Sequence, residues 1–260
     1  MLHILGAGLT DSHRGPGRVG ALHQRISLGE IRGPALLPVR AAVPGTEYSQ
    51  GWLDLDGITD DSTRSRGIDY FENSRRAARS QRAYAIENPS GFRGYGADTW
   101  GLTACDGAID TTLELAGASR RLRMYWARGV AAGDLRDDGT LAPTAAAAAH
   151  RLRPGHRGSD AARLPRALRR SPLHALRLRG LLQPHALHGP PGQGRRGRPG
   201  LGWFDTDYLG IDQGPIVIML ENHRSGLVWK TMRKNPYVVR GLCRAGFRGG
   251  WLDGRCRPDS

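Results

Sequence analysis

The aromatic residues of this chain fall in two windows, and this distribution limits where a packed core can form. All 17 of them lie either between Tyr48 and Trp126 or between Trp203 and Trp251. Aromatic side chains supply much of the buried area of a typical core, so a packed domain rarely omits them for long. We therefore expect ordered structure at residues 48–148 and 200–253, and irregular or disordered structure at about residues 10–45, within an N-terminal segment 1–47, and at 149–199.

The second aromatic-free stretch also carries most of the net charge. Residues 151–200 contain twelve arginines, no lysine and one acid, Asp160, which is +11 of the chain's formal net charge of +14. A basic balance of this size ordinarily suggests a nucleic-acid or anionic-surface partner. This segment, however, lacks the interleaved aromatics of a single-strand binder, and proline or glycine interrupts every candidate element. Binding of nucleic acid is therefore the least favoured function for this chain.

The cysteines and the apolar runs exclude several classes of protein. Cys105, Cys243 and Cys256 are odd in number and have no CxxC spacing, so we expect buried or incidental thiols rather than a disulfide framework or a zinc site. We expect no metal and no cofactor. The first fifteen residues lack the pattern of a signal peptide, and no stretch approaches the 18 to 20 apolar residues of a membrane span.

Helical spacing and stop signals predict several helices. One is expected at Asp69–Glu87, ending before Pro89, and an aromatic, glycine-rich loop should follow it. A second should begin near Pro143. A third should begin at Gly214-Pro215 and be buried on most sides, because residues 216–220 are all apolar. Shorter helices should follow it, separated near Ser225-Gly226 and at Pro236 and ending at Gly246. This pattern indicates an all-α assembly.

Four stretches in this order resemble the bacterial glucoamylase-like proteins, which are related to β-1,2-glucanases and to the middle domain of cyclic β-1,2-glucan synthases. They are "GIDYFENSRRA", "GYGADTWGLTACDG", "DDGTLAPTAAAA" and "DTDYLGIDQGPIVIMLENHRSGLVWK", extended by "NPYVVRGLCRAGF". The resemblance implies a partial (α/α)6 toroid, with paired helices around an acid-lined cleft that binds a glucan. It also implies a periplasmic or cell-envelope location. The oligomeric state stays open.

Cleavage of a glycosidic bond usually needs two carboxyl groups, so the acids inside these motifs are the catalytic candidates. They are Asp69, Glu72, Asp106, Asp138, Asp212 and Glu221. We expect five of them, all except Asp138, to converge on one concave surface. Asp69 and Asp212 are equally well explained as helix N-caps. Glu221 follows five apolar residues, which favours a position facing a polar cavity.

A glucan site also needs aromatic platforms for the apolar faces of the sugar rings and polar groups for their edges. The candidates in the motifs are Tyr95, Trp100, Trp203, Asp207, Tyr208 and Gln213. Aromatics of this kind are as often core residues as platforms.

Three functions follow, in order of preference. The first is a glycoside hydrolase or transglycosylase that acts on a glucan by two-carboxylate chemistry, with β-1,2-glucan as the substrate that the resemblance implies. The second is a non-catalytic carbohydrate-binding remnant that keeps the platforms but lacks a complete acid pair, and the third is the basic nucleic-acid binder.

Residues 149–199 depart from the family pattern, and 36 arginines against two lysines point to a GC-rich gene. We therefore hypothesise that this segment is read out of frame.

Overall fold

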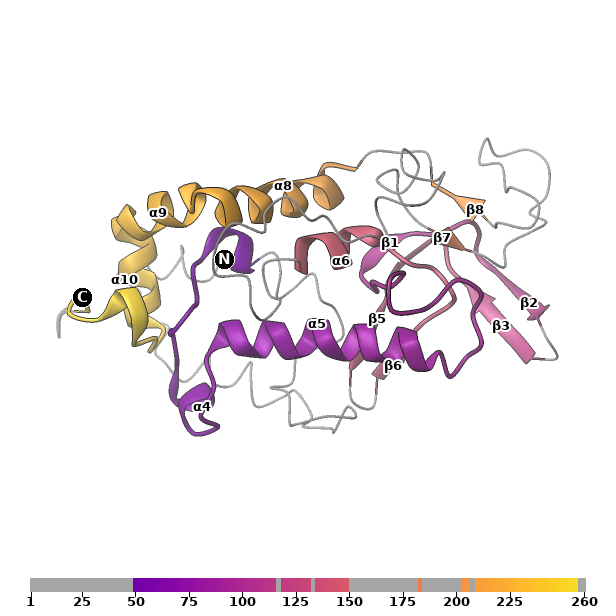
Figure 1. Cartoon of the computed structure of the whole chain (residues 1–260), viewed down its shortest axis with the longest axis horizontal. Helices are drawn as coiled ribbons and strands as arrows, with labels where there is room; N and C mark the ends of the chain where they lie inside the picture. The colour runs from indigo at the N-terminus through magenta and orange to yellow at the C-terminus, as the bar shows by residue number, and fades with distance from the viewer. Residues whose placement is uncertain are drawn as a thin grey trace.

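The computed structural model describes residues 49–115, 118–131, 134–149, 182–183, 203–205 and 209–256. The segments expected to be irregular, 1–47 and 149–199, lie outside these ranges except for Leu182, Gln183 and Ala149. Ordered structure is expected at residues 48–148 and 200–253. The described residues of these two ranges form helices and short strands (Figure 1).

Helices provide most of the described secondary structure. They are α4 (Asp61–Arg64), α5 (Tyr70–Glu87), α6 (Pro143–Ala148), α8 (Gly210–Arg224), α9 (Leu227–Lys234), α10 (Pro236–Arg244) and the 3-10 helix η3 (Gly250–Leu252). In Figure 1, α5 runs along one side of the molecule, while α8 and α9 run along the opposite side. Helix α6 packs on α8 and also reaches α5 through a small core of Ala78, Ala85, Trp100 and Ala149. None of the described helices has the length and apolar character needed to cross a bilayer.

Four antiparallel strand pairs complete the described structure, so the helical part of the fold prediction is confirmed but "all-α" is corrected. The pairs are β1 (Ala104–Asp106) with β4 (Tyr125–Ala127), β2 (Thr111–Leu115) with β3 (Ala118–Leu122), β5 (Gly129–Ala131) with β6 (Asp134–Arg136), and β7 (Leu182–Gln183) with β8 (Trp203–Phe204). Most strands have only two or three residues, too few for a clear alternation of polar and apolar side chains.

Helix α5 confirms the expected helix and shows why it begins and ends where it does. The Asp69 carboxylate accepts a hydrogen bond from the Glu72 backbone N–H at 2.6 Å, which caps the N-terminus. At the other end Asn88 takes a left-handed conformation, and its side chain accepts from the Phe92 N–H. These two caps set the length of the helix.

Helix α8 differs from its prediction in two ways. It begins at Gly210, because the N–H groups of Asp212 and Gln213 both donate to the Leu209 carbonyl and close the first turn there, so Pro215 lies inside the helix. The helix is also not buried on most sides. The exposed fractions of Val217 and Leu220 are 64% and 44%. One face, which includes Pro215 and Met219, is buried, so the apolar run only partly corresponds to core.

The C-terminal helices close a second core around the N-terminal end of the described chain. Leu53, Leu55 and Ile58 pack against Val238 and Leu242, and the backbone of Thr59 pairs with Arg248. The breaks predicted between α8, α9 and α10 are confirmed.

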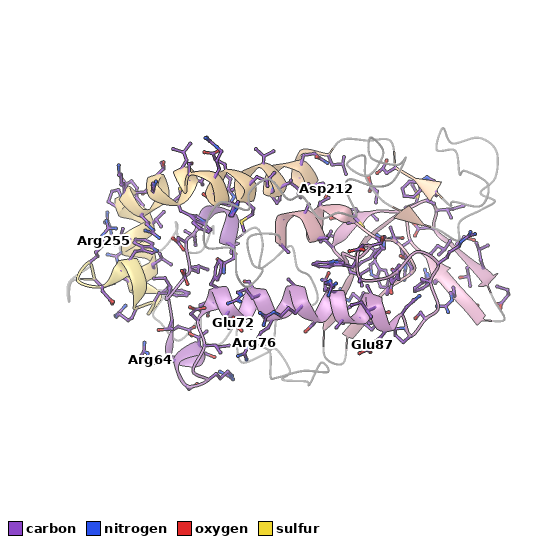
Figure 2. The ribbon with its side chains drawn as sticks, in the orientation of Figure 1. Arg64, Glu72, Arg76, Glu87, Asp212 and Arg255 are labelled. Carbon is purple, nitrogen blue, oxygen red and sulfur yellow. A yellow bond between two sulfur atoms is a disulfide. The ribbon has the colours of Figure 1, made fainter. Side chains whose placement is uncertain are left out.

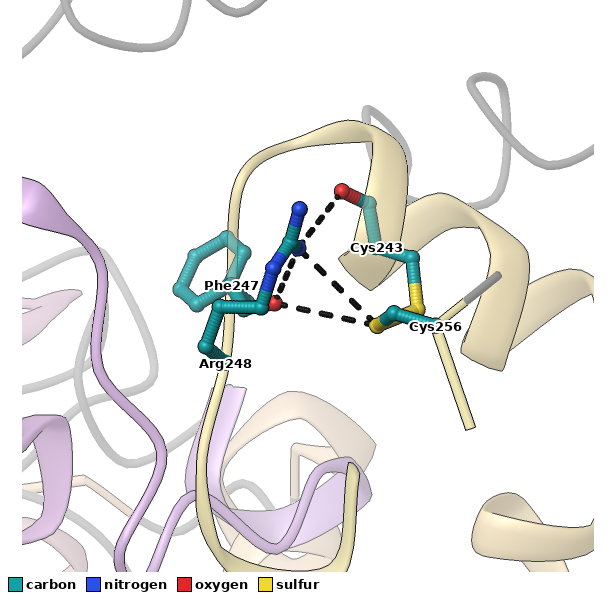
Figure 3. Close-up of a disulfide and its surroundings, with 4 residues drawn as sticks. All are labelled: Cys243, Phe247, Arg248 and Cys256. Atoms are coloured by element: carbon teal, nitrogen blue, oxygen red, sulfur yellow. Dashed lines mark hydrogen bonds between the residues drawn. A yellow bond between two sulfur atoms is a disulfide. The ribbon is translucent and has the colours of Figure 1, made fainter. Parts of the chain in front are cut away.

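A disulfide between Cys243 and Cys256 ties the end of α10 to the segment after η3 (Figure 3). The expectation of unpaired thiols is therefore wrong for both residues and is confirmed only for Cys105, which is buried and free. Spacing along the sequence did not reveal the pair, because the turn at Gly246 and η3 bring the two cysteines together. The Arg248 guanidinium braces this turn by donating to the carbonyls of Cys243 and Phe247 at 3.0 and 2.6 Å.

Candidate active site

Three aspartates from separate parts of the sequence lie near one another, on β1, after β8 and at the start of α8. Cys105 of β1 and Trp203 of β8 pack in one buried cluster with Ala142 and Leu122. Asp106 follows Cys105, and Asp205 comes two residues after Trp203. Asp212 lies in the first turn of α8, close enough to both carboxylates for their charges to act on it. The cluster thus joins two predicted candidates, Asp106 and Asp212, with one acid that was not predicted.

Within this cluster, Asp212 has a raised proton affinity. Burial, followed by the charges of Asp106 and Asp205, raises the pKa of Asp212 to about 6. Its exposed fraction is 6% (Figure 2 labels it at the start of α8). A position in the first turn of a helix normally favours the ionised form of an acid, so burial and like charge outweigh the helix dipole here. A carboxyl with this pKa is suited to donate a proton near neutral pH.

Asp138 has a different role in the structure. It forms a fully buried ion pair with Arg128, whose Nε donates to Oδ1 at 2.7 Å and whose Nη2 donates to Oδ2 at 2.8 Å. The Arg123 backbone N–H also donates to Oδ2, at 3.1 Å. These contacts use both oxygens of the carboxylate, so Asp138 holds the ribbon together at this point.

A second acid that sequence reasoning missed, Asp137, ties a loop to α5. It accepts hydrogen bonds from the hydroxyls of Tyr84 at 2.7 Å and Tyr95 at 2.6 Å, and from the Gly139 N–H at 2.9 Å. Burial raises the pKa of Asp137, while the hydrogen bonds from Tyr95, Gly139 and Tyr84 oppose that effect. The Tyr95 hydroxyl therefore belongs to this hydrogen-bond network, and the Tyr95 ring packs against Phe92.

Asp69 and Glu72 occupy the N-terminal end of α5. Besides capping the helix, the Asp69 carboxylate accepts from the Gly57 N–H at 2.9 Å. Glu72 pairs with Arg75 at 3.0 Å and with Arg76 at 3.1 Å. Figure 2 shows Glu72 near one end of α5 and Asp212 at the start of α8, and neither acid of α5 contributes to the shifted pKa of Asp212.

Glu221 lies on α8 but does not join the aspartate cluster. Its carboxylate accepts from Arg224 at 2.8 and 2.9 Å and from the Ser225 hydroxyl, and these bonds lower its pKa. These partners come from the C-terminal end of the same helix, so the Glu221 carboxylate is held within the last turn of α8. Gln213 lies beside Asp212 and is half-buried. Asp207 and Tyr208 lie outside the described residues.

Two of the predicted platform tryptophans are part of the core of this chain. The exposed fractions of Trp100 and Trp203 are 5% and 2%. Trp100 packs between α5 and α6, and Trp203 packs beside Cys105. Histidine, cysteine and acidic side chains do not gather into a metal-binding group anywhere in the described ranges.

The sequence of this chain matches a protein family model and a characterised relative. The model of the family Glycoamylase, described as "Putative glucoamylase", matches residues 29–236. An exo-β-1,2-glucooligosaccharide sophorohydrolase (non-reducing end) of Parabacteroides distasonis is 32% identical over 195 residues, which are 75% of this chain and 22% of that protein.

Solved structures agree with these matches. A "putative glucoamylase" of Bacteroides uniformis has a TM-score of 0.65 and 30% identity, over 96% of this chain and 54% of its own. An endo-β-1,2-glucanase of Chitinophaga pinensis, solved with sophorotriose and glucose, has a TM-score of 0.65 and 26% identity, again over 96% and 54%. The chain thus spans about half the length of these solved relatives. Since the family model covers most of the chain, this protein belongs to the glycoamylase family.

Proposed function

We propose that this chain carries part of the active site of a glycoside hydrolase that acts on β-1,2-linked glucans. The observation that supports this most is the aspartate cluster, in which a carboxyl with a pKa of about 6 stands beside two further acids. A glycosidase needs one protonated carboxyl to assist the leaving group and one ionised carboxylate as nucleophile or base. The relatives, named for hydrolysis of β-1,2-linked glucans, supply the substrate class.

The roles follow from the environments of the acids. Asp212, whose pKa is raised to about 6, is the proton donor to the glycosidic oxygen. Asp106, which is less buried than Asp205, is the second carboxyl, which acts on the anomeric carbon or on a water. The other predicted candidates, Asp69, Glu72, Asp138 and Glu221, remain alternatives for these roles in the complete site.

The architecture that we propose is a partial (α/α)6 toroid, with α5, α6 and α8 among its helices. We place the protein in the periplasm or cell envelope. The Cys243–Cys256 disulfide supports this location, because disulfides form and persist in oxidising compartments.

A specific observation favours the second function, a carbohydrate-binding remnant without activity. Four of the six predicted acids already have structural partners, because Asp69 caps α5, Glu72 pairs with two arginines, Asp138 lies in a buried ion pair and Glu221 pairs with Arg224. A protein of this kind would bind the glucan but leave it intact.

Incubation of the full chain with β-1,2-glucooligosaccharides, followed by chromatography of the products, separates the two functions. We expect shorter oligosaccharides from the unaltered chain and at least a hundredfold less from Asp212→Asn, because the amide cannot donate the proton. Asp98→Asn, an exposed aspartate, is the matched control. Binding measured by calorimetry without any product would favour the remnant, and neither binding nor product would contradict both.

A further inference from the structure

We propose that Arg128 and Gly107 are positioning residues that hold Asp106 of β1 in place beside Asp212 of α8. This inference rests on the proposed function, because Asp106 and Asp212 are the acids assigned there to glucan cleavage. Neither positioning residue touches the sugar. Each fixes the backbone next to Asp106 through a hydrogen bond.

Arg128 joins the two strands of the β1–β4 ribbon from inside. Its side chain is fully buried, and its Nη1 donates to the Cys105 carbonyl at 2.6 Å, while its Nη2 donates to the Arg123 carbonyl at 2.8 Å. The Cys105 carbonyl belongs to the peptide that leads into Asp106. A displacement of the guanidinium would therefore turn this peptide and move the Asp106 side chain with it.

Asp138 holds the guanidinium at this point through two parallel hydrogen bonds of 2.7 and 2.8 Å. This fork geometry is available to arginine and not to lysine, although both carry one positive charge. A lysine at residue 128 would keep an ion pair with Asp138. It could not also span the carbonyls of Cys105 and Arg123.

Gly107 acts from the other side of Asp106. Its N–H donates to the Met124 carbonyl across the ribbon. A Cβ at this position would overlap the Arg123 carbonyl oxygen and crowd the Arg128 guanidinium, so only glycine permits the close approach of the two strands. An alanine would push β1 away from β4 next to the acid.

Such precision matters because two-carboxylate chemistry depends on the separation of the two acids. Misplacement of a catalytic group by about 1 Å can cost two orders of magnitude in rate. A buried cation with six hydrogen bonds within and around the ribbon gives Asp106 a fixed backbone.

The test measures how strongly Asp106 changes the pKa of Asp212, and it does not require the chain to cleave glucan. The pKa of Asp212 is followed by NMR of its side-chain carboxyl in the full chain, with and without Asp106→Asn, in three backgrounds: unaltered, Arg128→Lys and Gly107→Ala. We expect Asp106→Asn to lower the pKa of Asp212 in the unaltered chain, and to lower it by less than half as much in the other two. Arg120→Lys and Gly96→Ala are matched controls, because Arg120 lies on β3 and a Cβ at Gly96 meets no atom within 4 Å.

An equal effect of Asp106→Asn in all backgrounds overturns the positioning role. If one variant fails to fold, as judged by near-ultraviolet circular dichroism, the other decides. Should the unaltered chain cleave glucan, Arg128→Lys should lower kcat at least about tenfold while KM stays within about twofold. Absence of cleavage would contradict the proposed function, whereas the NMR cycle would still decide the role of Arg128 and Gly107.

Discussion

At the scale of single residues, the aspartate cluster places an energetic cost on the folded state. The pKa of Asp212 rises from 3.8 to about 6, first through burial and then through Asp106 and Asp205. The folded state therefore binds the proton more tightly than the unfolded state between these two values. By linkage, the free energy of unfolding falls as the pH rises from about 4 to about 6, and the loss is complete above that range.

Replacement of Asp212 by asparagine should remove this cost. At pH 7.5 we expect Asp212→Asn to raise the free energy of unfolding by on the order of 3 kcal/mol, because the pKa rises from 3.8 to about 6 on folding and each pKa unit corresponds to about 1.4 kcal/mol. At about pH 2.5, well below the unfolded-state pKa of 3.8, the gain should vanish, since the acid is then protonated in both states. Urea unfolding at the two pH values measures the difference. The same change at both pH values would contradict the assignment, and Asp98→Asn should change stability by less than about 0.5 kcal/mol at either pH.

At the scale of elements, α8 combines a buried face with an exposed apolar face. Met219 is buried, whereas Val217, two residues earlier, is 64% exposed. The apolar run from Ile216 to Leu220 therefore contributes to the core through part of its side chains only. The hydrophobicity of a residue in this helix does not indicate its burial.

A pair of lysine substitutions tests this division. Met219→Lys should lower the free energy of unfolding by about 3 kcal/mol or more, because it buries a charge without a partner. Val217→Lys should change it by less than about 0.5 kcal/mol, because the side chain faces solvent. Chemical denaturation followed by circular dichroism gives both values. Similar losses in the two variants would show that α8 is enclosed on both faces.

At the scale of the whole molecule, the second core, in which Leu53–Ile58 pack against α10, joins the two ends of the described chain. Trp229 donates to the Gln50 carbonyl at 2.7 Å and Trp251 donates to the Asp54 carbonyl at 2.6 Å. These contacts link residues that are nearly 200 positions apart. The disulfide closes a short ring within this core.

Removal of the disulfide should weaken this junction. Cys243 and Cys256 are 13 residues apart, and closing a ring of about this size stabilises a protein by about 3 kcal/mol in the chain-entropy model. We expect the variant with both cysteines replaced by serine to lose on the order of this amount in urea unfolding. A phosphine reductant should destabilise the unaltered chain similarly and leave the double variant unchanged. An effect of the reductant on the double variant would mean that it acts elsewhere.

The hypothesis that residues 149–199 are read out of frame can be tested on the gene. The family match runs over residues 29–236, a range that includes the arginine-rich segment 149–199. If this segment is read out of frame, resequencing should find one insertion or deletion near each of its ends, and the corrected frame should restore aromatic residues between them. An unaltered reading frame in independent clones would refute the hypothesis.

The sequence by itself determined the elements whose signals are local. The cap at Asp69 and the stop at Asn88-Pro89 define α5, and the breaks at Ser225-Gly226 and Pro236 separate the last helices, because capping and proline act over a few residues. The motifs also determined the family.

Only the tertiary structure decided which side chains meet. Asp205 and Asp137 carry no local signal, and they become members of the aspartate cluster and of the tyrosine network through packing of distant segments. Asp138 stands in an equally suitable motif, yet its carboxylate is held by the buried Arg128. The disulfide likewise depends on the turn after α10. Burial, charge and pairing depend on neighbours that are far apart in sequence, and the free energy of folding is minimised over all of them together.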